Sequence, residues 1–133
     1  MNNFKITYFQ KNINEPISKD QRQKINSQKS DFFIFPSFFP FKETHNLKQI
    51  ADNEKIYLDS LLEISETYKG VIIGGSFPRV VEGQIIESCP IVQDIQLIDY
   101  YDTFQTQKEY GNKIQPRKGD SIYVLGKIRF GIC

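Results

Sequence analysis

The sequence predicts an α/β domain that has a mixed sheet with flanking helices. Three observations support this fold class. Residues 31–36 and 70–78 form short apolar runs, typical of strands that are covered on both faces. Between them, over residues 47–68, apolar side chains recur at helical spacing. After residue 78 the pattern changes to short strand-like runs, which favours antiparallel strands added to a parallel core.

The N-terminal region predicts one strand and one helix. Residues 4–10 alternate between apolar and polar side chains, as a half-buried strand does. Residues 17–28 are typical of a helix with Ser18 as its N-cap. The apolar face of this helix is nearly limited to Ile17 and Ile25, so we expect it to be weakly anchored.

The second and third predicted strands end in punctuating residues. The run at residues 31–36 stops at Pro36, which leaves Ser37 as the first residue beyond the strand. The helical pattern stops at Gly70, and the strand after it ends in a Gly-Gly turn. Strand ends of this kind are where parallel sheets usually carry their chemistry.

The C-terminal region predicts antiparallel structure. Residues 83–104 contain two strand-like runs, and residues 120–133 are typical of a hairpin with Gly126 near its turn. We expect one core sheet to contain the strands at 4–10, 32–36, 71–75 and 129–133. The helix ending near Tyr68 is expected to pack on one face of that sheet.

Composition and charge limit the partners. The chain has 133 residues, 39% of them hydrophobic and 25% charged, which is typical of one globular domain over residues 1–133. Its net charge is +1, from 17 basic and 16 acidic residues. We therefore expect neither nucleic acid nor a membrane as partner.

Cysteine and histidine usage indicates no cofactor and no metal. Two cysteines, Cys89 and Cys133, and an N-terminus without a cleavable apolar segment predict a reduced, cytoplasmic protein. A zinc site would have to combine the one histidine, His45, with two distant cysteines. A Ser–His–acid triad of Ser37 with His45 is disfavoured because no glycine elbow surrounds the serine. The glycines of "GVIIGGS" fit neither a phosphate-binding loop nor a dinucleotide-binding turn.

A series of strand ends resembles a known family over essentially the whole chain. "KITYFQ" is a first strand ending in Gln, and "DFFIFPS" is similar to the family pattern "DLVVFPE" except at its last position. "VIIGGSFP" matches a strand ending Gly-Ser, and "ESCPIV" matches an Asn-Ser/Thr strand with Glu87 in place of Asn. "PRKGDSIYVLGKIRFGIC" is similar to the segment that ends at the family's nucleophile. Together these motifs resemble the N-terminal half of the carbon–nitrogen hydrolases, the nitrilase-like amidases.

The resemblance implies a partial α-β-β-α layered sandwich and a specific set of site residues. Cys133 takes the position of the nucleophile and Glu109 that of a supporting glutamate. In the family a carboxylate removes the thiol proton, and a lysine stabilises negative charge on the substrate. The corresponding positions in this chain are Ser37 and Asp102, so both groups are lost.

Two other side chains, Lys108 and Glu43, are the available substitutes for the lost groups. The family also continues well past its cysteine, whereas this sequence stops at Cys133. We therefore expect a catalytically inactive remnant or fragment of a carbon–nitrogen hydrolase.

Two alternatives stay open at this point. The chain is then either a non-catalytic interaction protein or half of a split amidase that is completed in trans by a C-terminal half. The expected partners are a small-molecule amide or nitrile if the chain is active, and a second copy or the complementing half for assembly. Exposed strand edges and apolar strand faces favour a homo-oligomer.

Overall fold

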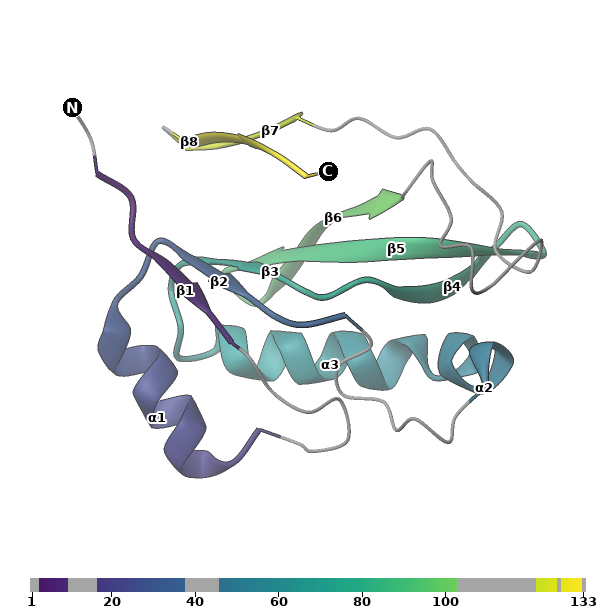
Figure 1. Cartoon of the computed structure of the whole chain (residues 1–133), viewed down its shortest axis with the longest axis horizontal. Coiled ribbons are helices and arrows are strands. Elements are labelled where there is room, and N and C mark those ends of the chain that lie inside the picture. Colours follow the sequence, from purple (N-terminus) through teal and green to yellow (C-terminus); the bar gives the residue numbers. More distant parts are fainter. Residues whose placement is uncertain (1–2, 10–16, 38–45, 103–121, 127, 133) are drawn as a thin grey trace.

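The structure is a computed structural model of the 133-residue chain, and it describes residues 3–9, 17–37, 46–102, 122–126 and 128–132. Within these ranges the chain forms three helices and eight strands (Figure 1). The helices are α1 (Lys19–Gln28), α2 (Leu47–Asp52) and α3 (Glu54–Ser65). The strands are β1 (Ile6–Tyr8), β2 (Phe32–Ile34), β3 (Val71–Ile73), β4 (Phe77–Val81), β5 (Gln84–Gln93), β6 (Gln96–Asp102), β7 (Ile122–Leu125) and β8 (Ile128–Gly131).

Six of the strands form one mixed sheet. β1, β2 and β3 pair in parallel, and the long strand β5 pairs antiparallel with β3, β4 and β6. Ser88 of β5 is paired with both Phe77 of β4 and Asp102 of β6, so those two strands lie on opposite sides of β5. β4 thus continues the line of β3 along one side of β5, and β6 forms an edge.

The structure has three layers. The helices cover one face of the six-stranded sheet, and β7 and β8 lie over the other face (Figure 1). β7 and β8 pair with each other as a separate two-stranded sheet. This α-β-β layering confirms the predicted layered architecture with a mixed sheet and flanking helices.

Two apolar clusters hold these layers together. On the helix side, Phe33 and Ile72 of the sheet pack with Tyr57 and Leu61 of α3, and all four side chains are fully buried. On the other side, Phe32, Val71 and Ile91 are buried by inward-facing side chains of the hairpin. These hairpin residues, with the following Ile132, are Tyr123, Leu125, Ile128 and Phe130. Strands β2, β3 and β5 therefore have apolar side chains on both faces, as their sequences predict.

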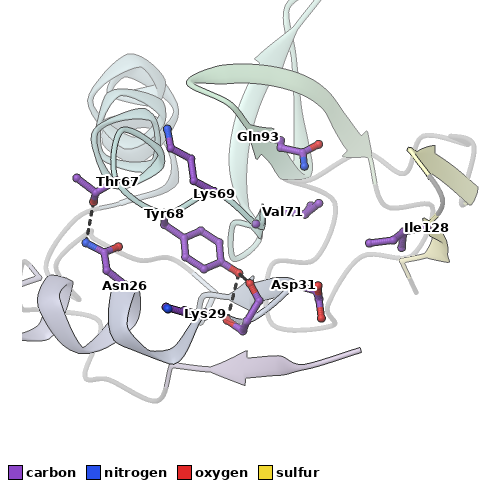
Figure 2. A pocket seen from close by; sticks show the side chains of 11 residues that line it. Asn26, Lys29, Asp31, Thr67, Tyr68, Lys69, Val71, Gln93 and Ile128 are labelled. Atoms are coloured by element: carbon purple, nitrogen blue, oxygen red, sulfur yellow. Dashed lines mark hydrogen bonds between the residues drawn. The ribbon is translucent and has the colours of Figure 1, made fainter. Parts of the chain in front are cut away.

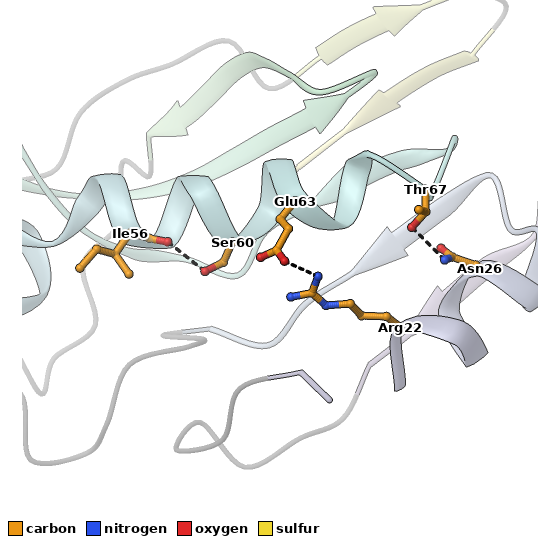
Figure 3. A network of polar contacts seen from close by, with 6 residues as sticks. All are labelled: Arg22, Asn26, Ile56, Ser60, Glu63 and Thr67. Carbon is orange, nitrogen blue, oxygen red and sulfur yellow. Dashed lines mark hydrogen bonds and ion pairs between the residues drawn. The ribbon is translucent and has the colours of Figure 1, made fainter. Parts of the chain in front are cut away.

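Helix α1 begins where the sequence predicts and is joined to α3 by polar contacts. Ser18 forms a capping box with Gln21. Arg22 Nη1 lies 2.6 Å from Glu63 Oε1, and Asn26 donates a hydrogen bond to the Thr67 hydroxyl (Figure 3). Because the ion pair is largely exposed, it adds little to stability. The weak anchoring predicted for this helix is confirmed, since Ile25 is its one buried residue.

The structure corrects three details of the predicted elements. The helical pattern of residues 47–68 forms two helices, α2 and α3, separated at Asn53. Strand β4 was not predicted, because Pro78 and Arg79 interrupt its apolar pattern. Strand β8, which was expected in the main sheet, belongs to the second sheet. Its side chains pack face to face on the main sheet, with Phe130 and Phe32 ring centroids 5.1 Å apart.

The hairpins on both sides of β5 turn through residues with positive φ. Glu82 and Gly83 connect β4 to β5, with φ of 51° and 76°. Asp94 and Ile95 connect β5 to β6, with φ of 51° and 61°. Two successive positive φ values match the twist of antiparallel strands, but a β-branched residue is strained there. Ser65 stabilises the turn between β5 and β6 by accepting a hydrogen bond from the Ile95 amide.

We predict that Ile95→Asn stabilises the protein. Asn adopts the left-handed conformation more readily than Ile, for which it costs roughly 1–2 kcal/mol, and the exposed Ile95 side chain loses little packing. Denaturant unfolding is expected to show a gain of about 1 kcal/mol. Ile98→Asn is the matched control, because Ile98 is also exposed but lies in β6 without a positive φ. An equal gain in both variants would contradict backbone strain as the cause.

Candidate functional site

The candidate site lies where β2 and β6 end, on opposite sides of the projecting β4–β5 hairpin. Ser37 follows the end of β2, and its hydroxyl accepts a hydrogen bond from Ser76 at 3.0 Å. Asp102 is the last residue of β6 and is paired with Ser88, which is paired in turn with Phe77. Ser37 and Asp102 are therefore at nearly the same level along the strands but about three strand spacings, roughly 14 Å, apart.

A glycine determines how Ser37 is held. A Cβ atom at Gly75 would lie 1.7 Å from the Pro36 carbonyl oxygen, so only glycine permits this close approach of the two backbones. Gly75 does not have a positive φ. The Gly-Gly pair predicted as a turn is thus needed here for space, and it brings Ser37 against Ser76.

Asp102 belongs to a buried polar network. Its Oδ1 accepts hydrogen bonds from Ser88 Oγ at 2.6 Å and from Arg79 Nη2 at 3.1 Å. Arg79 Nε also donates to Ser88 Oγ at 3.1 Å. The side chains of Arg79 and Asp102 are only 16% and 11% exposed. The three side chains therefore satisfy one another within the structure.

The network lies on the helix-bearing face of the sheet. The Arg79 guanidinium stacks on the Tyr100 ring, 4.0 Å from its centroid. Tyr100 packs against the cluster under α3. Burial, followed by the negative charge of Glu54, raises the pKa of Tyr100 above its ordinary value. Asp102 thus points away from the face that the β7–β8 hairpin covers.

Glu87 and Cys89 lie on the opposite face of β5. Both residues are buried, and Glu87 is the residue that replaces Asn in the family pattern. The Cys89 thiol donates a hydrogen bond to the Gly74 carbonyl oxygen. Burial, with the charge of Glu87 as a smaller cause, raises the pKa of Cys89 to about 12. Cys89 is accordingly a packed strand residue.

The residues predicted to carry catalysis lie outside the described residues. These are Cys133 and Glu109, together with Lys108 and Glu43, the two side chains considered as substitutes. Sequence reasoning missed Arg79 and Ser88. Their signal was weak, because an arginine and a serine in short strands are compatible with solvent exposure, and their partner Asp102 is distant in sequence.

A separate pocket of about 490 Å³ lies at the other end of the parallel strands (Figure 2). Several of its polar side chains have partners within the fold. Asn26 binds Thr67, the Tyr68 hydroxyl donates to the Ser30 carbonyl oxygen, and Lys69 donates to the carbonyl oxygen of the residue that caps the C-terminus of α3. The pocket therefore lies between the C-terminal ends of α1 and α3 and the sheet, away from Ser37 and Asp102.

Within the described ranges, no three His, Cys, Asp or Glu side chains are grouped so that they could hold a metal ion. Among the same residues, every helix is too short or too polar to span a bilayer.

We predict that Asp102→Lys, which introduces the cation that the resemblance implies at this position, destabilises the protein. A lysine there faces Arg79 and leaves two cations without a counterion, which costs about 3 kcal/mol or more. Denaturant unfolding measures the change. The charge swap Arg79→Asp with Asp102→Lys is expected to recover at least half of the loss. Gln96→Lys, at an exposed position of the same strand, is the control and is expected to have little effect. Wild-type stability of Asp102→Lys would contradict the network.

We also predict that Cys89 is unreactive in the folded protein. With a pKa of about 12, roughly one thiol in 10,000 is ionised at pH 8. Alkylation of Cys89, measured by mass spectrometry in a Cys133→Ala variant, is expected to follow global unfolding. Labelling of native protein at the rate of a free thiol peptide would contradict this.

Comparisons with known proteins place this fold. Neither protein-family models nor curated protein sequences give a match to the chain. Solved structures do match. NitN amidase from Nesterenkonia sp. AN1 superposes with a TM-score of 0.69 and 14% identity, over 96% of this chain and 55% of the amidase. Saccharomyces cerevisiae Nit3, from branch 10 of the nitrilase superfamily, superposes with a TM-score of 0.63 and 15% identity, over 88% of this chain and 49% of Nit3.

A third structure, the glutamine-dependent NAD+ synthetase from Acinetobacter baumannii, gives a TM-score of 0.63 and 16% identity, over 84% of this chain and 22% of the synthetase. The chain therefore spans about half the length of the two smaller proteins, and less of the synthetase. At these identities the likeness establishes the fold. This chain has a nitrilase-like α/β fold, similar over most of its length to carbon–nitrogen hydrolases of the nitrilase superfamily.

Proposed function

We propose that this chain is a carbon–nitrogen hydrolase-like protein that does not hydrolyse amides or nitriles. The Asp102–Arg79 ion pair is the observation that carries the proposal. The family chemistry needs a cation that is free to stabilise negative charge on the substrate. Here the position assigned to that cation holds an anion, and the nearby guanidinium is already bonded to it.

The environment of Ser37 supports the same conclusion. A hydroxyl has a pKa far above that of a carboxylate, so it cannot accept a thiol proton near neutral pH. Loss of a positioned general base costs about 10²–10⁴ in rate. Ser37 is hydrogen-bonded to another hydroxyl, that of Ser76, which offers no stronger base. Cys133 and Glu109 remain the proposed positions of the nucleophile and the supporting glutamate.

A non-catalytic role in protein interaction is the second candidate function. It is favoured by apolar side chains of β1 and β7 that are more than half exposed, including Ile6, Tyr8 and Val124. Surfaces of this kind mark contacts with other chains. The third candidate is half of a split amidase, favoured by the 55% share of NitN amidase that the chain covers.

We predict that the purified chain has no amidase or nitrilase activity. Product release from simple aliphatic amides and nitriles, measured over hours at high protein concentration, is expected to equal that of the Cys133→Ala variant. The proposal is overturned if the chain releases product and Cys133→Ala abolishes that release.

Restoring the base alone tests the same argument from the other direction. Ser37→Glu supplies a carboxylate but leaves Arg79 bonded to Asp102. This variant is expected to fold, as judged by circular dichroism, and to remain inactive. Activity in Ser37→Glu would show that a free cation at position 102 is not required.

A further inference from the structure

The pocket of about 490 Å³ lies where two chain connections approach each other closely. One connection leads from α1 to β2, and the other leads from α3 to β3. A Cβ atom at Gly70, in the second connection, would lie 2.6 Å from the carbonyl oxygen of Asp31, in the first. Only glycine permits this approach, and the approach brings two lysines to one pocket, Lys29 after α1 and Lys69 after α3.

Lys29 has a backbone conformation that does not suit a lysine. It follows the last residue of α1 with φ of 47° and ψ of 41°, in the left-handed region. Glycine is the usual residue at such a helix end, and a side chain there reduces stability. Among the described residues, the Lys29 ammonium makes no hydrogen bond or ion pair that would offset this cost. The negative end of α1 already has a cation, since the Lys5 ammonium donates to the Gln28 carbonyl oxygen at 2.6 Å. A strained residue without a structural contact for its side chain indicates a functional role.

The other walls of the pocket supply a second cation and an apolar surface. The Lys69 ammonium donates to the Glu66 carbonyl oxygen at 3.2 Å. Because an ammonium has three donors, Lys69 retains donors for a ligand. Val71 and Ile128 line the pocket on the side of the sheet and the hairpin, away from the two lysines (Figure 2).

The charges around the pocket leave a small positive excess. Lys29 and Lys69 line it, and Lys5 lies beside the end of α1. These three ammonium groups are opposed by the Asp31 carboxylate and by the C-terminal ends of α1 and α3, each of which carries about half a negative charge. The excess is therefore about one positive charge, and an anion is the ligand that it favours.

We propose that this pocket binds a small organic anion, which has a carboxylate or phosphate group on an apolar body. The acidic group lies between the ammonium groups of Lys29 and Lys69, and the apolar body packs on Val71 and Ile128. Ligand pockets typically combine an apolar wall with a few polar groups that fix the orientation of the ligand. The inference does not rest on the proposed lack of hydrolysis, because the pocket lies at the other end of the parallel strands from Ser37.

Titration of the full chain with phenyl phosphate, followed by NMR of the backbone amides, tests the proposal. The amide signals of Lys29, Lys69 and Gly70 are expected to shift. Inorganic phosphate and phenol, the two halves of the probe, are each expected to bind at least about tenfold more weakly, since each makes only part of the contacts. Benzoate tests a carboxylate in place of the phosphate.

Variants of Lys29 separate a role in binding from a role in the fold. Lys29→Gly is expected to be at least as stable as the wild type in denaturant unfolding, because glycine relieves the left-handed backbone. It is nevertheless expected to weaken binding of phenyl phosphate about tenfold, because a charged hydrogen bond to the ligand is lost. Lys29→Gln removes the charge without changing the backbone, and it is expected to weaken binding similarly. Lys24→Gln is the matched control, because Lys24 is an exposed lysine of α1 outside the pocket.

Four results would overturn the proposal. The first is the absence of amide shifts with both phenyl phosphate and benzoate at millimolar concentration. The second is a set of shifts centred on Ser37 and Asp102 instead of the pocket. The third is equal binding of phenol or of inorganic phosphate, which would remove the need for the cations or for the apolar wall. The fourth is wild-type affinity in Lys29→Gln, or equal weakening by Lys24→Gln.

Discussion

The six-stranded sheet has apolar side chains on both faces, and each face must be kept from water. Phe33 and Ile72 point to one side of the parallel strands, and Phe32 and Val71 point to the other. Burial of a large apolar side chain contributes about 1.5–3 kcal/mol, so the two faces together dominate the stability of this small chain. The helix layer covers one face of the sheet and the hairpin layer covers the other, so both layers are needed.

The two layers meet the requirement unequally. α3 lies along its face and buries Tyr57, Leu61 and Ile64 against the sheet. Within the described part of the chain, the hairpin is two strands wide and packs on Phe32, Val71 and Ile91 of the other face. A two-stranded sheet is marginal by itself, so β7 and β8 rely on the sheet beneath them as much as the sheet relies on them. In three solved structures with this fold the aligned part is about half of the protein or less.

Much of the fold could be predicted from the sequence because local patterns determine it. Apolar runs identify β2 and β3, and Ser18 with Gln21 identifies the start of α1. The sheet to which β8 belongs could not be predicted. Alternating side chains show that a strand has one buried face, but they do not show whether its partner is a neighbouring strand or a layer below. The same limit explains why β4 was not predicted. In the sequence Arg79 is compatible with an exposed position, and its buried partner Asp102 is known only from the structure.

The candidate site was less predictable than the fold. The motifs placed Ser37 and Asp102 at strand ends, and both are found there. The sequence pattern did not identify the partner of Asp102. Charge balance in a folded protein depends on neighbours across strands, and Arg79 lies two strands away on the same face.

The Arg79–Asp102 pair also explains how this strand end can hold a buried charge and remain stable. An isolated charge at a strand end under helix α3 would be costly to bury. A guanidinium that is hydrogen-bonded to the carboxylate and to Ser88, and stacked on Tyr100, removes most of that cost. The same contacts withdraw the guanidinium from any substrate. Pairing of the buried carboxylate and availability of a free cation for a ligand are therefore competing demands at this position, and in this chain the carboxylate is paired.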